Sequence, residues 1–320
     1  MTKDEINKQL KKLLEISDAN YEKIISSYEK EIVKIYSSSL KEIKSQIAAM
    51  YEKYGDKVEY SDMVSYNRLK NLESQIADQI KQLTNDTIKN TKEKLNFFFS
   101  ESYYLTSYAI EKAVGIDLGF GLLDPLVIEA SWKNELSKIK WTESMQEHAQ
   151  KFMKDIREEL TRGLIEGKGY GKIASAITER TGITAGKVLR IVRTEGHRVQ
   201  SAGSLLAYDK TQAAADRLGL KTVKVWVATL DNRTRDTHQQ MDGQEADAEG
   251  MFTFPGGEKT PAPGIQGPPE EIINCRCTTI MQFKDFPQKF RRDNETKQII
   301  EYTNYADWKK KRASSDQNEG

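Results

Sequence analysis

The sequence has few cysteines and no long apolar run. It holds two cysteines among 320 residues, Cys275 and Cys277, and a single residue separates them. This spacing does not suggest a disulfide framework, so we expect a reduced, cytosolic protein. No apolar run approaches the roughly 20 residues of a membrane-spanning helix. The polar start, Met1–Glu5, is unlike a secretory signal. We therefore predict no membrane partner.

The sequence also lacks an excess of charge of either sign. Lys and Arg number 49 and Asp and Glu number 48, which gives a formal net charge of +1. No overall field draws such a protein to nucleic acid, so any binding of this kind must come from local patches. With 38% hydrophobic and 30% charged residues, the chain has little material for one compact core, which favours an elongated part.

Helical periodicity dominates the first third of the chain. Apolar residues recur at spacings of three and four over residues 6–54, and again from residue 61 to the cluster Phe97–Phe99. A helix stop at Gly55 lies between them, which predicts a helical hairpin forming an N-terminal arm over residues 1–114. One helix cannot bury its apolar stripe alone, so it needs a partner helix within the chain or from another subunit. The residues predicted to dock on another protein are Tyr28, Ile32, Ile35, Tyr36 and Leu40.

The rest of the chain divides into three predicted segments. Residues 115–140 form a connector that begins rich in Gly, and residues 284–320 form a polar, partly disordered tail. Between them, residues 141–283 hold shorter helices at 141–166, 172–181 and 185–218 and strand-like stretches at 225–227 and 272–280. The predicted fold class is therefore α+β: a long helical arm, a helical segment and a small β-containing C-terminal domain. The basic residues Lys309, Lys310, Lys311 and Arg312 are candidates for contact with nucleic-acid phosphates.

A set of metal-binding residue types lies in the C-terminal part. Cys275, Cys277 and His238 offer two thiolates and an imidazole to a tetrahedral ion, and zinc is the ion that suits them. Asp242 or Asp231 could add an oxygen ligand. The alternative is that both cysteines are small core residues and that His238 is a hydrogen-bonded core histidine.

Charged residues near this set predict a structural polar network, whose members are Arg193, Glu195, Asp231, Arg235 and Asp242. Asp231 would cap the turn after the first strand, Arg235 would bridge Asp231 and Asp242, and Asp242 with Gly243 would close a tight turn. For the helical members, Arg193 and Glu195, a solvated helix face is the alternative.

The same residue types allow a catalytic hypothesis. Asp231, His238 and Asp242 could serve a metal-dependent nuclease or hydrolase acting on nucleic acid. No nucleophile elbow, HExxH helix or phosphate loop accompanies them. The residues therefore favour a structural role over catalysis.

Several spaced motifs in the second half of the chain occur in a recognisable order. They are Arg193-Thr194-Glu195, Trp226, Asp231-x3-Arg235-x2-His238-x2-Met241-Asp242-Gly243, Phe252, a Pro-rich loop and Asn274-Cys275-Arg276-Cys277. This order resembles the minor head (head morphogenesis) proteins of tailed bacteriophages, the family of the Mu F and SPP1 proteins. The resemblance covers roughly residues 141–283.

The resemblance implies a structural minor capsid protein at the portal vertex, which supports head assembly and DNA packaging or ejection. It implies the portal protein and a major capsid or scaffolding protein as partners, and non-specific contact with phage DNA. The protein would reside in the virion, and in the host cytoplasm during assembly. Any metal role of the family would carry over to His238, Cys275 and Cys277. We expect no enzymatic activity on this basis.

Overall fold

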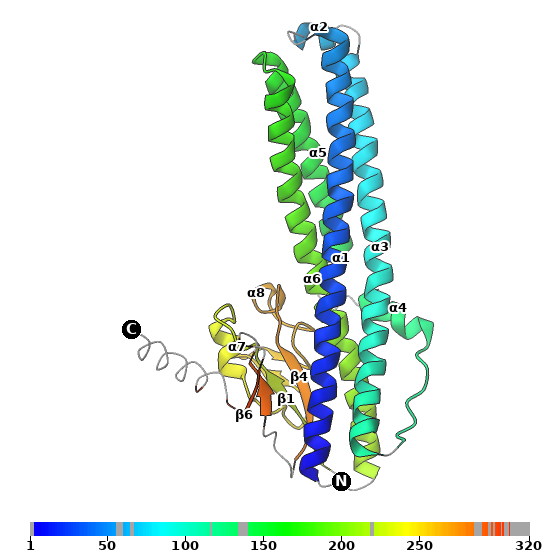
Figure 1. The fold of residues 1–320 in the computed structure, drawn as a ribbon, viewed down its shortest axis with the longest axis vertical. Coiled ribbons are helices and arrows are strands. Elements are labelled where there is room, and N and C mark those ends of the chain that lie inside the picture. Colours follow the sequence, from blue (N-terminus) through cyan, green and yellow to red (C-terminus); the bar gives the residue numbers. More distant parts are fainter. Residues whose placement is uncertain are drawn as a thin grey trace. The chain divides into compact units, whose positions relative to one another are not determined.

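The computed structural model describes residues 3–55, 60–64, 67–115, 117–133, 140–217, 221–284, 290–293, 296, 298–301, 303 and 307. The helices are α1 (Lys3–Tyr54), α2 (Tyr60–Val64), α3 (Arg68–Val114), α4 (Pro125–Lys133), α5 (Trp141–Ile165), α6 (Tyr170–Arg217), α7 (Asp236–Met241) and α8 (Pro269–Ile272). The strands are β1 (Thr222–Val227), β2 (Phe252–Thr253), β3 (Lys259–Thr260), β4 (Thr278–Phe283), β5 (Phe290–Arg292) and β6 (Ile299–Glu301). Figure 1 shows this succession, which confirms the predicted α+β class. No helix of the described part is long and apolar enough to cross a membrane.

The chain forms two compact units, each built from segments that are distant in sequence. The first unit comprises residues 1–24, 94–138 and 193–320, and the second comprises residues 25–93 and 139–192. The helices α1, α3 and α6 each contribute residues to both units. These units therefore divide the chain differently from the consecutive segments predicted from sequence.

The second unit is a bundle of helices around one apolar core. Its parts of α1, α3, α5 and α6 run side by side in Figure 1. Its fully buried side chains are Ile43, Ile47, Ile76, Ile156, Leu160 and Ile177. Polar contacts join its segments, such as the hydrogen bond that the Tyr51 hydroxyl donates to the Lys168 carbonyl at 2.7 Å. The apolar stripes of both halves of the chain therefore meet in this bundle.

The stripe predicted to dock on a partner lies largely inside this bundle. Tyr28, Ile32 and Tyr36 are at most 5% exposed, and Ile35 and Leu40 are partly buried. The Tyr28 and Thr91 hydroxyls hydrogen-bond at 3.0 Å. Burial raises the pKa of Tyr28 and that of Tyr36 to about 12. The docking role does not fit this burial, because the chain's own helices cover the stripe.

Helix α6 corrects the prediction of two helices separated at Gly182. The helix runs unbroken from Tyr170 to Arg217, through Gly182 and Gly186, which have open space where a side chain would begin. A glycine inside a helix costs only about 1 kcal/mol relative to alanine. Burial of Ile177, Val188 and Val192 on the same helix outweighs that cost.

The first unit carries the β-structure. Strand β1 pairs antiparallel with β4, with Val225 opposite Ile280. The predicted second strand began at Ile272, but Ile272 ends α8 and Asn274 has a positive φ of 56°, so β4 begins only at Thr278. The Tyr208 hydroxyl of α6 donates to the Thr279 carbonyl at 2.9 Å.

Part of the predicted tail is folded. Strands β5 and β6 form an antiparallel pair, and the partly buried Ile300 packs against Leu230. The four basic residues Lys309, Lys310, Lys311 and Arg312 lie outside the described residues.

Candidate functional site

The turn after β1 is held by Asp231, as predicted. Its Oδ1 accepts hydrogen bonds from the Arg233 amide at 3.0 Å and from the Thr234 hydroxyl at 3.2 Å. The same carboxylate forms a bidentate ion pair with Arg276, whose Nη2 lies 2.9 Å from Oδ1. The bridge predicted for Arg235 is therefore corrected, since Arg276 is the arginine that pairs with Asp231.

Arg235 and Asp242 serve separate parts of the loop. The Arg235 guanidinium donates to the carbonyl of Ile273. The Asp242 Oδ1 accepts the Ala228 amide at 2.8 Å, and Gly243 follows in the left-handed region at φ 80°. Asp242 therefore closes the predicted tight turn, and it ties the end of β1 to the end of α7.

Acid should weaken this part of the fold through Asp231. Burial raises the pKa of its carboxyl, but the hydrogen bonds and charge of Arg276 outweigh burial and lower the pKa from 3.8 to about 2. A folded-state pKa below the unfolded one gives stability that is complete above the unfolded pKa and is lost as the pH falls through the folded one. Thermal unfolding measured between about pH 5 and about pH 2 should show a falling Tm, and Asp231→Asn should make that fall shallower.

The exposed Asp216 offers a matched control, since Asp216→Asn should keep the wild-type steepness. Equal pH slopes for the wild type and Asp231→Asn would contradict the assignment.

The predicted metal-binding residues do come together. His238, Cys275 and Cys277 are buried, and their ligand atoms all lie within 4.8 Å of one another. The His238 Nδ1 is 3.2 Å from the Cys277 sulfur and 3.7 Å from the Cys275 sulfur. Asp242 and Asp231 are not part of this group, which corrects both as oxygen ligands.

Aromatic residues and a carboxylate surround this group. The Trp226 ring meets the His238 ring edge-on with centroids 5.5 Å apart, and the Phe254 ring lies 5.9 Å away. The other ring nitrogen, Nε2, is 2.9 Å from Glu271 Oε2, although it is oriented away from ideal hydrogen-bond geometry. Both cysteines are free thiols. Burial raises the pKa of Cys277 well above its usual value, whereas the hydrogen bond from Cys277 lowers the pKa of Cys275.

A second polar cluster lies on α6. The Arg198 Nε donates to Glu195 Oε2 at 2.8 Å, and its Nη1 donates to the Ser131 carbonyl at 2.9 Å. The Thr194 hydroxyl accepts the Asn274 amide at 3.2 Å. These contacts form a buried network around Glu195, and Thr194, Glu195 and Arg198 are all buried. Arg193 forms an ion pair with Glu22 at 3.5 Å.

Sequence reasoning missed three residues that position the site. Arg276 was noted only as the residue between the cysteines, although it carries the pairing assigned to Arg235. Glu271 lies in the short helix α8, after the predicted Pro-rich loop, and nothing in the sequence pointed from it to His238. Ser131 contributes a main-chain carbonyl, and main-chain groups leave no signal in a sequence.

The three residues of the nuclease hypothesis make different contacts. Asp231 pairs with Arg276, Asp242 accepts a main-chain amide, and His238 faces the two sulfurs. This arrangement gives no support to a common catalytic role for the three.

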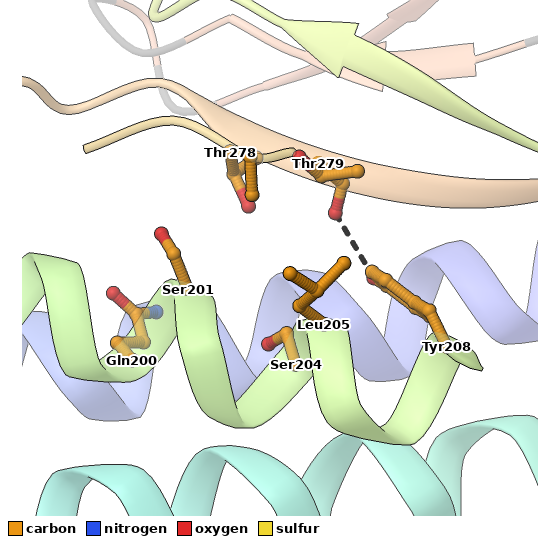
Figure 2. A pocket seen from close by; sticks show the side chains of 8 residues that line it. Gln200, Ser201, Ser204, Leu205, Tyr208, Thr278 and Thr279 are labelled. Atoms are coloured by element: carbon orange, nitrogen blue, oxygen red, sulfur yellow. Dashed lines mark hydrogen bonds between the residues drawn. The ribbon is translucent and has the colours of Figure 1, made fainter. Parts of the chain in front are cut away.

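A small polar cavity lies between α6 and β4 (Figure 2). Gln200, Ser201, Ser204 and Leu205 of α6 face Thr278 and Thr279 of β4 across it. Its volume is about 10 Å³, which is about the space of one water molecule. The cavity therefore does not hold a substrate in this conformation.

Comparison with known proteins gives this arrangement a family. A family model described as "Phage Mu protein F like protein" matches residues 154–280. The "Minor head protein GP7" of Bacillus phage SPP1 is 30% identical over 304 residues, which cover 93% of this chain and 97% of that protein. The chain belongs to the Mu F-like family of phage minor head proteins. No solved structure matches the chain.

Membership of this family indicates the general role of the chain. A Mu F-like minor head protein has a structural part in head morphogenesis and resides in the virion. The residues that carried the resemblance, from Arg193 to Cys277, all lie in the first unit.

A second relative corrects the prediction that the chain has no enzymatic activity. The "NAD(+)--arginine ADP-ribosyltransferase EFV" of Enterococcus faecalis (strain ATCC 700802 / V583) is 29% identical over 305 residues. The match covers 95% of this chain and 60% of that protein. This chain therefore has a relative that is named for an enzymatic activity. The prediction of no enzymatic activity is wrong on this evidence.

Proposed function

We propose that this Mu F-like protein acts at the portal vertex of a tailed-phage head. There it supports head assembly and DNA packaging or ejection, with the portal protein as its principal partner and a major capsid or scaffolding protein as a second. Contact with phage DNA is non-specific, because a formal net charge of +1 provides no overall attraction to phosphates.

The observation that carries this proposal is the extent of the match to the SPP1 minor head protein. The similarity covers nearly the whole of both chains, so the helices of both units are included as well as the family domain. The fold is consistent with a structural role, because the apolar stripes of its long helices are buried within the chain.

Co-purification with the portal protein of the same genome tests the proposal. The full-length chain serves as bait, because α1, α3 and α6 contribute to both units and a truncated arm would not leave either unit intact. We expect retention of the cognate portal protein and no retention of the portal protein of an unrelated phage. Failure to retain the cognate portal protein would contradict the proposal.

Particle imaging supplies an independent test. Gold-labelled protein in purified heads should mark a single vertex per particle. Labels spread over the whole capsid surface would instead indicate a role on the major capsid lattice.

The enterococcal relative supports a second candidate, transfer of ADP-ribose from NAD+ to arginine. The support for this candidate is the 29% identity over 95% of this chain. The chain spans only 60% of that relative's length. Incubation of the folded full-length chain with labelled NAD+ and an arginine-rich acceptor tests it. Label on the acceptor supports this candidate, and an unlabelled acceptor contradicts it.

A further inference from the structure

We propose that His238, Cys275 and Cys277 bind one zinc ion that fixes α7 to the start of β4. The inference goes beyond the role in the phage head, because it concerns how the C-terminal fold is held together. It rests on the distances between the three ligand atoms, the partner of the second histidine nitrogen and the charge balance of the site.

The distances fit a tetrahedral ion. Zinc lies about 2.3 Å from a thiolate sulfur and about 2.0–2.1 Å from an imidazole nitrogen, so the nitrogen and each sulfur stand roughly 3.5 Å apart. The two separations from the His238 Nδ1, 3.2 and 3.7 Å, lie on either side of that value. Small shifts of the Cys277 and Cys275 side chains therefore create the site.

The histidine is oriented as a ligand. With Glu271 Oε2 at 2.9 Å from Nε2, a small rotation of the ring lets Nε2–H donate to the carboxylate. That tautomer leaves the lone pair on Nδ1, which faces both sulfurs. A carboxylate behind a metal-binding histidine is a recurrent arrangement, because it fixes the ring and increases its basicity. The Thr237 hydroxyl, 2.8 Å from the same Oε2, holds Glu271 in place.

Charge balance allows the site to be buried. Two thiolates and one Zn²⁺ sum to zero, and the two thiol protons leave to solvent when the ion binds. A neutral centre suits the apolar surroundings of Trp226, Phe252 and Phe254, where an unbalanced charge would be costly. Three protein ligands leave a fourth position, which solvent fills in zinc sites of the Cys2His type.

The consequence is a cross-link within the first unit. His238 lies on α7, whereas both cysteines lie between α8 and β4, so the ion closes the chain between residues 238 and 275. Such a closure stabilises a loop-rich region, since binding energy to a folded site adds to folding energy.

Metal content of the full-length protein is the first test. Protein made in zinc-supplemented cells and purified without chelators should contain one zinc per chain by mass spectrometry. Cys277→Ser should lose the metal, whereas His148→Ala, which removes a histidine distant from the three ligands in sequence, should keep it. Loss of zinc in His148→Ala, with zinc retained in Cys277→Ser, would overturn the assignment.

Cobalt substitution tests the wild-type chain directly and does not depend on a variant that folds. Co²⁺ bound at this site should give tetrahedral absorption with a thiolate-to-cobalt charge-transfer band. Folded wild-type protein that contains no zinc and gives no such band would overturn the proposal. A cobalt spectrum without the charge-transfer band would do the same, because it would indicate ions held only by surface oxygen and nitrogen.

The role of Glu271 has its own matched pair. Loss of a carboxylate that orients a metal-binding histidine typically lowers metal affinity 10–100-fold. We expect this loss for Glu271→Ala and none for Glu270→Ala, which changes the exposed neighbour on the same short helix. Equal zinc affinities for the two variants would show that Glu271 does not position His238.

Discussion

Replacing Glu195 with alanine is expected to lower the free energy of unfolding by about 3–5 kcal/mol. The Glu195 and Arg198 side chains are 2% and 7% exposed, with the Nε–Oε2 distance at 2.8 Å. Without the carboxylate, the Arg198 guanidinium stays buried. Among the described residues, the Ser131 carbonyl is then its one remaining hydrogen-bond acceptor. A buried charge without its counter-charge is among the largest single-site penalties known in proteins. Urea unfolding followed by circular dichroism measures the loss.

The double replacement should behave differently from the single one. Burial raises the pKa of Glu195, and the charge of Arg198 only partly opposes this, so the pair itself is expensive to desolvate. Exchanging both residues for apolar ones of similar volume is often neutral or stabilising. We therefore expect Glu195→Leu combined with Arg198→Met to recover most of the stability that Glu195→Ala loses.

Glu179 on the same helix provides the control, since it is exposed. Glu179→Ala should change stability by less than about 0.5 kcal/mol. If Glu195→Ala is as mild as Glu179→Ala, the buried ion pair is not formed in solution.

Replacing Gly203 with alanine should lower the free energy of unfolding by about 1–3 kcal/mol. A Cβ atom at Gly203 would lie 2.3 Å from the Phe99 carbonyl oxygen and 3.1 Å from the Tyr103 nitrogen. Both are main-chain atoms of α3, so the helix itself must move to make room. The displacement also disturbs the hydrogen bond that the Ser102 hydroxyl donates to the Gln200 carbonyl at 2.7 Å. Thermal and urea unfolding measure the effect.

The same substitution elsewhere in α6 should have the opposite sign. Gly186 lies in the helix with nothing within 4 Å of an added Cβ. Gly186→Ala should therefore raise stability by up to about 1 kcal/mol, through the higher helix propensity of alanine. If both variants were stabilising, α3 and α6 would not pack as closely at Gly203 as the structure has them.

The helical parts of this fold follow from local periodicity, and for that reason they could be predicted. Stripes such as Ile43, Ile47 and Ile76 are read directly from spacing, and they do form the core of the bundle. The prediction of a break at Gly182 was wrong because it considered the low helix propensity of glycine without the burial of apolar residues on the same helix, which outweighs it. The residues that cover the stripe around Tyr28 are set by long-range contacts, such as its hydrogen bond with Thr91. The spacing of apolar residues does not predict these contacts.

The candidate site was predictable in its residue types and not in its pairings. His238, Cys275 and Cys277 stood out because few residue types bind metals, and the fold does bring them together. Asp231 was correctly placed as a turn cap, because that contact is local. Its ion pair with Arg276 spans 45 residues, whereas the predicted partner, Arg235, is a near neighbour of Asp231 in the sequence. Only the register of β1 on β4 decides between them.

The interleaving of the two units bears on the order in which they can form as the chain is synthesised. The second unit has all its residues once residue 192 has been made. The first 24 residues, by contrast, belong to a unit whose last segment begins at residue 193 and reaches the C-terminus. Residues 1–24 must therefore wait for segments made after residue 192, whereas the second unit can form before those segments are made.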